Sequence, residues 1–145
     1  MLSNYSRNVV DHEVMMMIML WNKTLEMGIP AIDEQHKELF RQVGILFDNT
    51  NADRVHQTLE FLEYYVGKHF RDEQQLQFKS QYPKMEQHKK MHIEFVTAFK
   101  QMKQEYNADV TKLTVLLKIN KMAADWLKQH IMIHDREFAT YYKSL

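Results

Sequence analysis

Six metal-ligand side chains fall on the apolar faces of four predicted helices, and this pattern constrains the fold more than any other feature of the chain. They are His36, His69, Glu73, His88, His92 and His130. His69 and Glu73 are four residues apart, as are His88 and His92, so each pair shares one face of a helix. Burying five imidazoles without partners would be costly, and histidine is the commonest metal ligand. We therefore expect the fold to bring these side chains together around metal.

Apolar residues recur at three- and four-residue steps in four segments, which predicts four helices. We expect these helices at about residues 33–49, 52–79, 83–106 and 110–132. Asp33 is expected to cap the first helix, and Pro83 suits the first turn of the third. The sequence contains only three glycines and two prolines and has no alternating strand pattern. Residues 136–145 are expected to form a short helix or an extended cover.

Four helices joined by short loops predict an all-α fold, an antiparallel up-down-up-down four-helix bundle with an N-terminal extension. The bundle is expected to span residues 21–145, with residues 1–20 as an extension that it does not need. In such a bundle the start of one helix lies level with the end of the helix before it. The six ligand side chains should therefore meet at one end of the bundle.

Composition and charge exclude several classes of function. The formal net charge is +0, which argues against nucleic acid or an anionic membrane as partner. The chain has no cysteine, so it has neither disulfides nor thiolate metal sites. The apolar run at residues 14–21 is shorter than the roughly 20 residues that span a bilayer, and its flanks differ from those of a secretory signal. We expect a soluble, cytoplasmic protein with no membrane partner.

A second carboxylate ligand is expected near the end of the fourth helix, where two neighbours compete. His134 lies four residues after His130 and shares its face if the helix continues, so periodicity favours His134. Coordination chemistry favours Asp135, because two ions held by neutral imidazoles alone would leave uncompensated charge in a dry core. A helix end or a bulge would turn Asp135 inward. His56 is expected to face solvent.

The type of ligand narrows the choice of metal. Imidazoles with one or two carboxylates suit iron, zinc, copper or nickel, whereas calcium and magnesium prefer oxygen ligands. Seven ligands exceed what one tetrahedral ion needs and fit two ions that are bridged by carboxylates.

With these motifs the chain resembles the hemerythrins, and specifically the bacterial single-domain hemerythrins, over about residues 21–142. The matching segments, in order, are Trp21, Ile32-Asp33-Glu34-Gln35-His36, His69-Phe70-Arg71-Asp72-Glu73, Tyr82-Pro83, His88 with His92, and Trp126-Leu127 with His130 and Asp135. The sequence departs from the pattern at Gln74, where a second glutamate is common, and at Gln77, where the family often has methionine. Neither position is a ligand position.

The resemblance implies a non-heme di-iron centre. One iron would be held by His88, His92 and His130. The other would be held by His36 and His69, which leaves a coordination position open for O₂.

Two carboxylates complete the centre that the resemblance implies. Glu73 and Asp135 would bridge the two irons, together with a solvent-derived oxo or hydroxo group. An apolar wall around the O₂ site would exclude water, with plain core packing as the alternative role for each residue. The expected wall residues are Leu39, Phe40, Phe70, Trp126 and Leu127.

The function expected from this resemblance is reversible O₂ binding for storage, delivery or sensing, rather than catalysis. Two alternatives use the same site. One is a di-iron enzyme that acts on peroxide or nitric oxide, and the other is an iron or metal buffer. No spare general acid or base stands beside the ligands in the sequence, which disfavours the enzyme.

Overall fold

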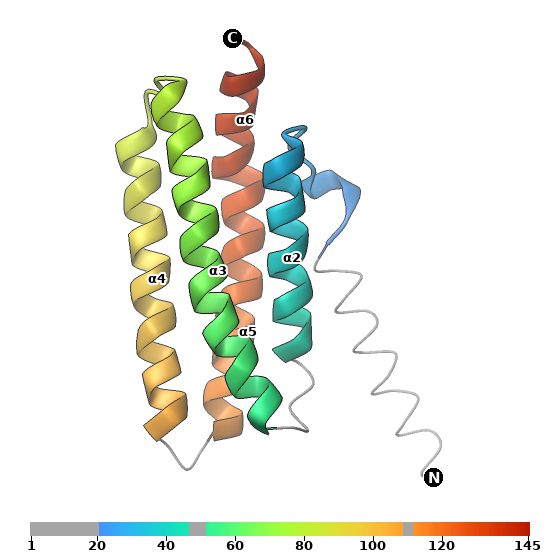
Figure 1. Cartoon of the computed structure of the whole chain (residues 1–145), viewed down its shortest axis with the longest axis vertical. Coiled ribbons are helices and arrows are strands. Elements are labelled where there is room, and N and C mark those ends of the chain that lie inside the picture. Colours follow the sequence, from blue (N-terminus) through green and yellow to red (C-terminus); the bar gives the residue numbers. More distant parts are fainter. Residues whose placement is uncertain (1–20, 47–51, 109–111) are drawn as a thin grey trace.

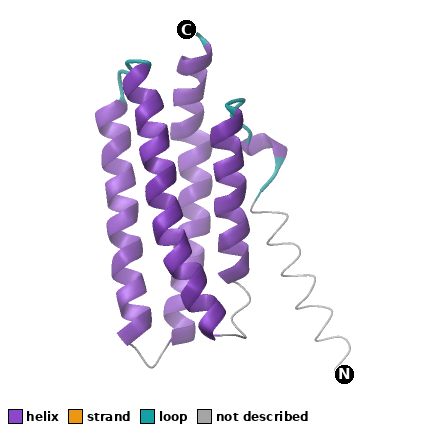
Figure 2. Ribbon diagram, viewed as in Figure 1, coloured by secondary structure: helices purple, strands orange, loops and turns teal. Residues whose placement is uncertain are grey.

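All regular structure in the described part of the chain is helical. The computed structural model describes residues 21–46, 52–108 and 112–145. The elements are η1 (Lys23–Leu25), α2 (Pro30–Leu46), α3 (Ala52–Lys79), α4 (Met85–Ala108), α5 (Lys112–Gln129), η2 (His130–Asp135) and α6 (Arg136–Lys143). Here η1 is a 3-10 turn and η2 is a π-helical segment through which α5 continues into α6. The predicted all-α class is confirmed (Figure 2).

The long helices form the predicted antiparallel bundle. α2 packs on α3, α3 on α4, α4 on α5, and α5 packs back on α2, so the four helices close a ring around one core (Figure 1). Each helix runs opposite to the one before it, and the line of α5, η2 and α6 forms the fourth member. No helix in the described ranges combines the length and apolar character needed to cross a membrane.

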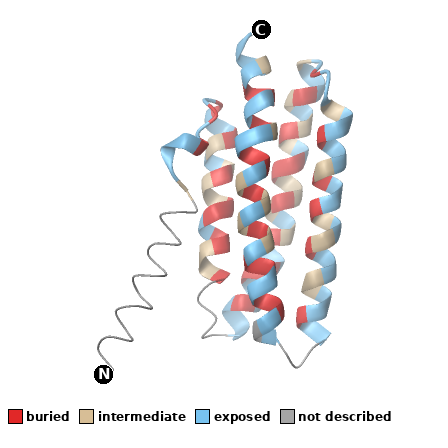
Figure 3. Ribbon diagram, turned by 180° about the vertical axis from the view of Figure 1, so that it is seen from behind, coloured by how far each residue is buried: buried red, intermediate tan, exposed pale blue. Residues whose placement is uncertain are grey.

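The core forms where the apolar stripes of the four helices meet. Buried residues recur along each helix at the spacing of one face, as Figure 3 shows. The largest fully buried apolar side chains are Phe40, Phe138, Leu25, Leu39, Leu46, Leu59, Leu62, Ile119, Leu127 and Ile131. Among the buried polar side chains, Asn120 of α5 joins two helices: it donates a hydrogen bond to the Leu46 carbonyl oxygen at the end of α2, at 3.2 Å.

The first helix begins earlier than expected. We predicted a start near Asp33, but α2 begins at Pro30, because proline lacks an amide hydrogen and its fixed φ suits the first helical position. Asp33 therefore does not cap its own helix. Its carboxylate accepts hydrogen bonds from the backbone amides of Met27 at 2.7 Å and Gly28 at 3.1 Å, and so ties the preceding loop to α2.

The third helix begins later than expected. We predicted that Pro83 would occupy its first turn, but α4 starts at Met85. The reason lies in how α3 ends. Gln81 adopts a left-handed backbone with φ of 57°, and the Tyr82 amide donates back to the Gln77 carbonyl oxygen at 2.9 Å, as in a Schellman motif. The Met85 amide then bonds the Tyr82 carbonyl oxygen at 3.2 Å, so Pro83 lies in a turn before the helix.

We predicted that the fourth helix ends at about residue 132, but it continues beyond that residue. The helical path continues through η2 into α6, so the expected short helix at the C-terminus is confirmed as the extension of a longer element. The expected end of the first helix at residue 49, the start of the fourth at residue 110, and the extension at residues 1–20 lie outside the described residues.

Candidate metal centre

The fold brings together all seven side chains expected at the centre, and every one of them is buried. Two overlapping groups have ligand atoms within 4.8 Å of one another. The larger group consists of Glu73, His88, His92, His130 and Asp135, and the smaller consists of His36, His69, Glu73 and Asp135. Four helical elements contribute, because α2 supplies one residue, α3 two, α4 two and η2 two. His56 is exposed, as expected.

Three imidazoles of the larger group point their Nε2 atoms at one spot. The Nε2 atom of His130 lies 3.0 Å from that of His92 and 3.0 Å from that of His88. Where no proton lies between them, neutral imidazole nitrogens that present lone pairs to one another repel at this distance. A cation between them removes the repulsion, so the arrangement has the form of a three-nitrogen metal site.

Each carboxylate divides its two oxygens between the groups. Oε1 of Glu73 lies 2.6 Å from Nε2 of His88, whereas Oε2 lies 3.5 Å from Nε2 of His69. Oδ1 of Asp135 lies 3.0 Å from Nε2 of His88, whereas Oδ2 lies 3.1 Å from Nε2 of His36. Both carboxylates are therefore placed to serve two ions at once, one oxygen for each.

Buried polar atoms without hydrogen-bond partners test whether metal fits this site. Buried polar groups nearly always have a partner, so each exception requires an explanation. Oε2 of Glu73, both oxygens of Asp135 and Nε2 of His36 are buried and lack one. All four atoms point into the cluster, and all are good donors to a divalent transition metal. The residues present fit a pair of such ions.

The π-helical segment explains how Asp135 enters the site. In a regular α-helix, Asp135 would lie about 140° around the axis from His130. The Arg136 amide instead bonds the Ile131 carbonyl oxygen, five residues back, and this wider turn aligns Asp135 with His130. His134 stays outside both groups and half-buried, with its ring centroid 5.6 Å from that of His130. This geometry agrees with coordination chemistry, which favoured Asp135, and disagrees with periodicity, which favoured His134.

Glutamine side chains bond the outward nitrogens of two cluster histidines. Oε1 of Gln35 lies 2.7 Å from Nδ1 of His69, and Nε2 of Gln35 donates to Asp72 at 2.8 Å. Nε2 of Gln74 lies 3.4 Å from Nδ1 of His92. Sequence reasoning missed the role of Gln35 and Asp72. The sequence did contain a signal for this pair, because Gln35 directly precedes His36 and Asp72 directly precedes Glu73 on two neighbouring helices.

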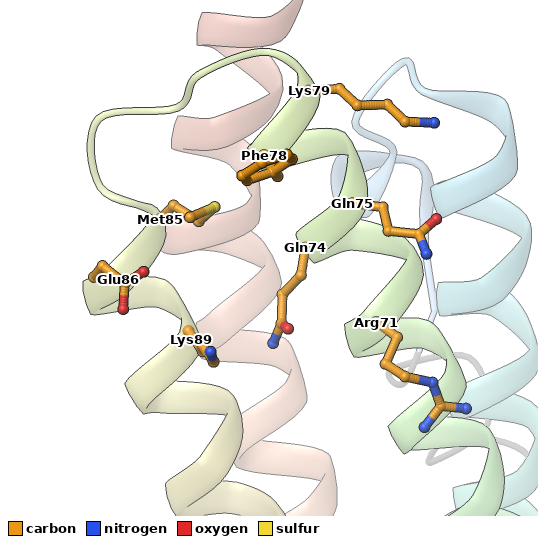
Figure 4. Close-up of a pocket in the computed structure, with 8 residues that line it drawn as sticks. All are labelled: Arg71, Gln74, Gln75, Phe78, Lys79, Met85, Glu86 and Lys89. Atoms are coloured by element: carbon orange, nitrogen blue, oxygen red, sulfur yellow. The ribbon is translucent and has the colours of Figure 1, made fainter.

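A third glutamine and a surface pocket lie beside these contacts. Gln77 is fully buried, and its Nε2 atom donates to Oε1 of Glu73 at 3.4 Å. Gln74 also lines a pocket of about 340 Å³ between α3 and α4. Its lining residues are Arg71, Gln74, Gln75, Phe78, Lys79, Met85, Glu86 and Lys89 (Figure 4). Gln74 therefore connects the outer side of His92 with a water-accessible surface.

Aromatic rings cover the larger histidine group. Phe70 stacks on His92 with ring centroids 3.7 Å apart and planes 3° apart, and Trp126 stacks on His130 at 4.3 Å and 10°. These two expected wall residues thus touch ligand rings. The other expected wall residues are buried in the same core. They are Leu39, Phe40 and Leu127.

In the absence of metal, the cluster shares its protons unevenly. Burial, with the nearby negative charge of Asp135, raises the pKa of Glu73 to about 8. Burial lowers the pKa of His88, but the adjacent carboxylates of Asp135 and Glu73 outweigh it and raise that pKa to about 9. Burial beside other imidazoles lowers the pKa of His92 to about 2. Burial opposes ionisation of Asp135, yet the surrounding histidines hold its pKa well below the usual value.

We predict that the metal-free protein loses stability as pH rises from about 7.5 to about 9.5. The unfolded chain has already released the protons of Glu73 and His88, with ordinary pKa values of 4.5 and 6.5, whereas the folded chain holds them to about 8 and about 9. Raising pH removes protons that only the folded state binds, which costs on the order of 2 kcal/mol of unfolding free energy.

Urea unfolding of the metal-free protein at both pH values measures this difference, and His88→Gln is expected to reduce it. A free energy of unfolding that is equal or higher at the upper pH would contradict the assignment. With a divalent metal bound, this dependence should largely disappear, because metal displaces the same protons from the folded state.

Comparisons with known proteins agree with this geometry. The model of the hemerythrin HHE cation-binding domain family matches residues 27–142. The chain is 33% identical over 111 residues to a myohemerythrin of Theromyzon tessulatum, covering 77% of this chain and 82% of that protein. It is 30% identical to a hemerythrin of Themiste dyscrita, covering 81% and 88%. It is 25% identical to a bacteriohemerythrin of Stenotrophomonas maltophilia, covering 89% and 84%.

A solved structure supports the same fold. A crystal structure of a protein in which a leucine is replaced by phenylalanine superposes on this chain with a TM-score of 0.68 at 24% identity. The match covers 78% of this chain and 87% of that one. The family match spans both halves of the ligand set, from α2 to η2. The chain belongs to the hemerythrin family.

Proposed function

We propose that this chain binds O₂ reversibly at a pair of non-heme iron ions, in storage, delivery or sensing. The observation that carries the proposal is the division of two buried carboxylates between histidine groups of unequal size. The larger group offers five protein ligands and the smaller offers four. An ion in the smaller group keeps a coordination position for a small ligand. The hemerythrins and myohemerythrin to which the chain is similar support O₂ as that ligand.

In this proposal, His88, His92 and His130 would hold one iron, and His36 and His69 would hold the other. The carboxylates of Glu73 and Asp135 would serve both. Iron, when bound, supplies the reversible redox chemistry on which O₂ binding depends. The ligand types also suit zinc, so the choice of iron rests on the family rather than on the donors alone.

The chain's own residues would exclude water and limit proton supply around the site. Phe70 and Trp126 stack on ligand rings, and His36 and His69 are fully buried. The direct partner of His69 outside the ligand set is a neutral amide, that of Gln35, which does not release a proton at ordinary pH. These features favour holding O₂ over converting it, which supports binding rather than the enzyme acting on peroxide or nitric oxide.

Reversible oxygenation tests this function. We expect reduced, iron-loaded protein to develop near-ultraviolet and visible charge-transfer bands in air, and to lose them when O₂ is removed, over repeated cycles. Irreversible oxidation without an oxygenated species would contradict the proposal. Sustained consumption of peroxide or nitric oxide would support the enzyme instead, and a full complement of zinc after iron-replete expression would support a metal buffer.

The choice between neighbouring residues in η2 gives a second prediction. Asp135→Ala removes one of the two bridging carboxylates, so we expect it to bind fewer than two irons per chain and to lose the charge-transfer bands. His134→Ala changes a half-buried side chain outside both ligand groups and should keep two irons. Iron counting and optical spectra of both variants check this, and the reverse result would overturn the assignment of Asp135.

A further inference from the structure

The cluster histidines differ in the hydrogen bond that each makes through Nδ1, the ring nitrogen that faces away from the cluster. His69 has a shorter one than His92, and His36 has none. The Nδ1 atom of His69 lies 2.7 Å from Oε1 of Gln35. The Nδ1 atom of His92 has a longer contact of 3.4 Å with Gln74, and the buried Nδ1 atom of His36 has no hydrogen-bond partner. The histidine with the short contact belongs to the smaller group, which has fewer protein ligands to hold an ion.

The hydrogen bonds beyond Gln35 have a fixed direction. A carboxylate only accepts hydrogen bonds, so Asp72 requires the NH₂ end of the Gln35 amide, which it meets at 2.8 Å. The amide oxygen of Gln35 must then point the other way, toward His69. That oxygen only accepts, so Nδ1 of His69 must carry the hydrogen. The other ring nitrogen, Nε2, is left with a lone pair that faces the cluster.

The outer end of this series is held at the surface. Lys68, one turn before Asp72 on α3, donates to the same carboxylate oxygen, Oδ2, at 3.2 Å. Asp72 therefore contacts both an ammonium and an amide donor, and the Gln35 side chain spans the gap between α2 and α3. Without Asp72, the amide could rotate and present its NH₂ group to His69, which would favour the tautomer with hydrogen on Nε2.

We propose that Gln35, held in one orientation by Asp72, is a positioning residue that fixes the tautomer of His69 and keeps its Nε2 atom available to the metal ion of the smaller group. The inference rests on the proposed function only in taking that group as a metal site. It goes beyond the ligand set in one respect: binding of an ion in the smaller group would depend on Asp72, a surface carboxylate that does not contact the ion.

Cobalt(II) titration tests the requirement without involving O₂. Losing the outer partner of a ligating histidine costs about 10- to 100-fold in metal affinity. We expect Gln35→Leu to weaken binding of one of the two cobalt ions by about this factor and to leave the other unchanged, because His88, His92 and His130 keep their surroundings. Circular dichroism should show the same helix content as the wild type.

Asp72→Asn is the more selective variant, because it retains the shape of the side chain and leaves Gln35 intact. It should weaken the same cobalt ion, since either orientation of the Gln35 amide becomes acceptable. Asp125→Asn is the matched control. Asp125 pairs with Lys121 across the same four-residue step of a helix, at 3.7 Å, but it is exposed and lies outside both ligand groups of the described residues. Cobalt binding by the control should equal that of the wild type.

A double variant separates tautomer control from general damage. Combining Gln35→Glu with Asp72→Asn exchanges the amide and the carboxylate, so the group at position 35 still accepts from Nδ1 of His69 and now also accepts from the amide at position 72. We expect this pair to recover most of the lost affinity, whereas Gln35→Glu alone places two carboxylates in contact and should not.

Proton exchange gives a readout that a merely structural role would not move. In the cobalt-loaded protein, the imidazole N–H protons of bound histidines have paramagnetically shifted NMR signals. The Nδ1–H signal of His69 should exchange with D₂O about tenfold faster in Gln35→Leu than in the wild type. Equal cobalt affinity and equal exchange in Gln35→Leu and the wild type would overturn this inference while leaving the metal centre intact. Failure of the wild type to bind two ions would instead overturn the proposed function.

Discussion

The structure depends on two carboxylates that each serve two sets of histidines inside a closed core. Glu73 and Asp135 are separated by 62 positions in the chain, yet both direct one oxygen to each histidine group. Two buried carboxylates with oxygen atoms within 4.8 Å of each other cannot both ionise unless cations compensate them. In the metal-free cluster, protons perform this task imperfectly, and several donor atoms stay unpaired. The four-helix ring provides the one level at which all seven side chains can meet.

The surroundings of the cluster are mainly neutral. Aromatic rings cover the imidazoles of the larger group, and three glutamine amides contact the cluster from outside: Gln35, Gln74 and Gln77. Amides orient imidazoles and carboxylates without adding charge, so the ionic balance of the core stays with the ligands and whatever they bind. A carboxylate in this outer layer, Asp72, acts through Gln35 and is itself paired with Lys68.

Much of the fold and the candidate site follows from periodicity and chemistry in the sequence. The stripes that carry His36, His69 and His92 predicted both the helices and their convergence. Asp135 required a different argument, because the π-helical segment that turns it inward breaks the 3.6-residue period. The need for negative charge and the family motif favoured it instead. The positions of Gln35 and Asp72 directly before ligands were a signal for their contact, but the contact itself depends on the exact rotation of α2 against α3. The fixed φ of Pro30 and the hydrogen-bonded turn before Met85, rather than periodicity, set the starts of α2 and α4.

The most direct test of the account is X-ray absorption on the iron-loaded protein, combined with an iron count. We predict two irons per chain, histidine nitrogen in the coordination shells, and an iron–iron scattering contribution at a distance below about 4 Å, as expected for two ions bridged by shared carboxylates. A single iron per chain, or two irons without any iron–iron contribution, would contradict the central claim that Glu73 and Asp135 join two metal ions.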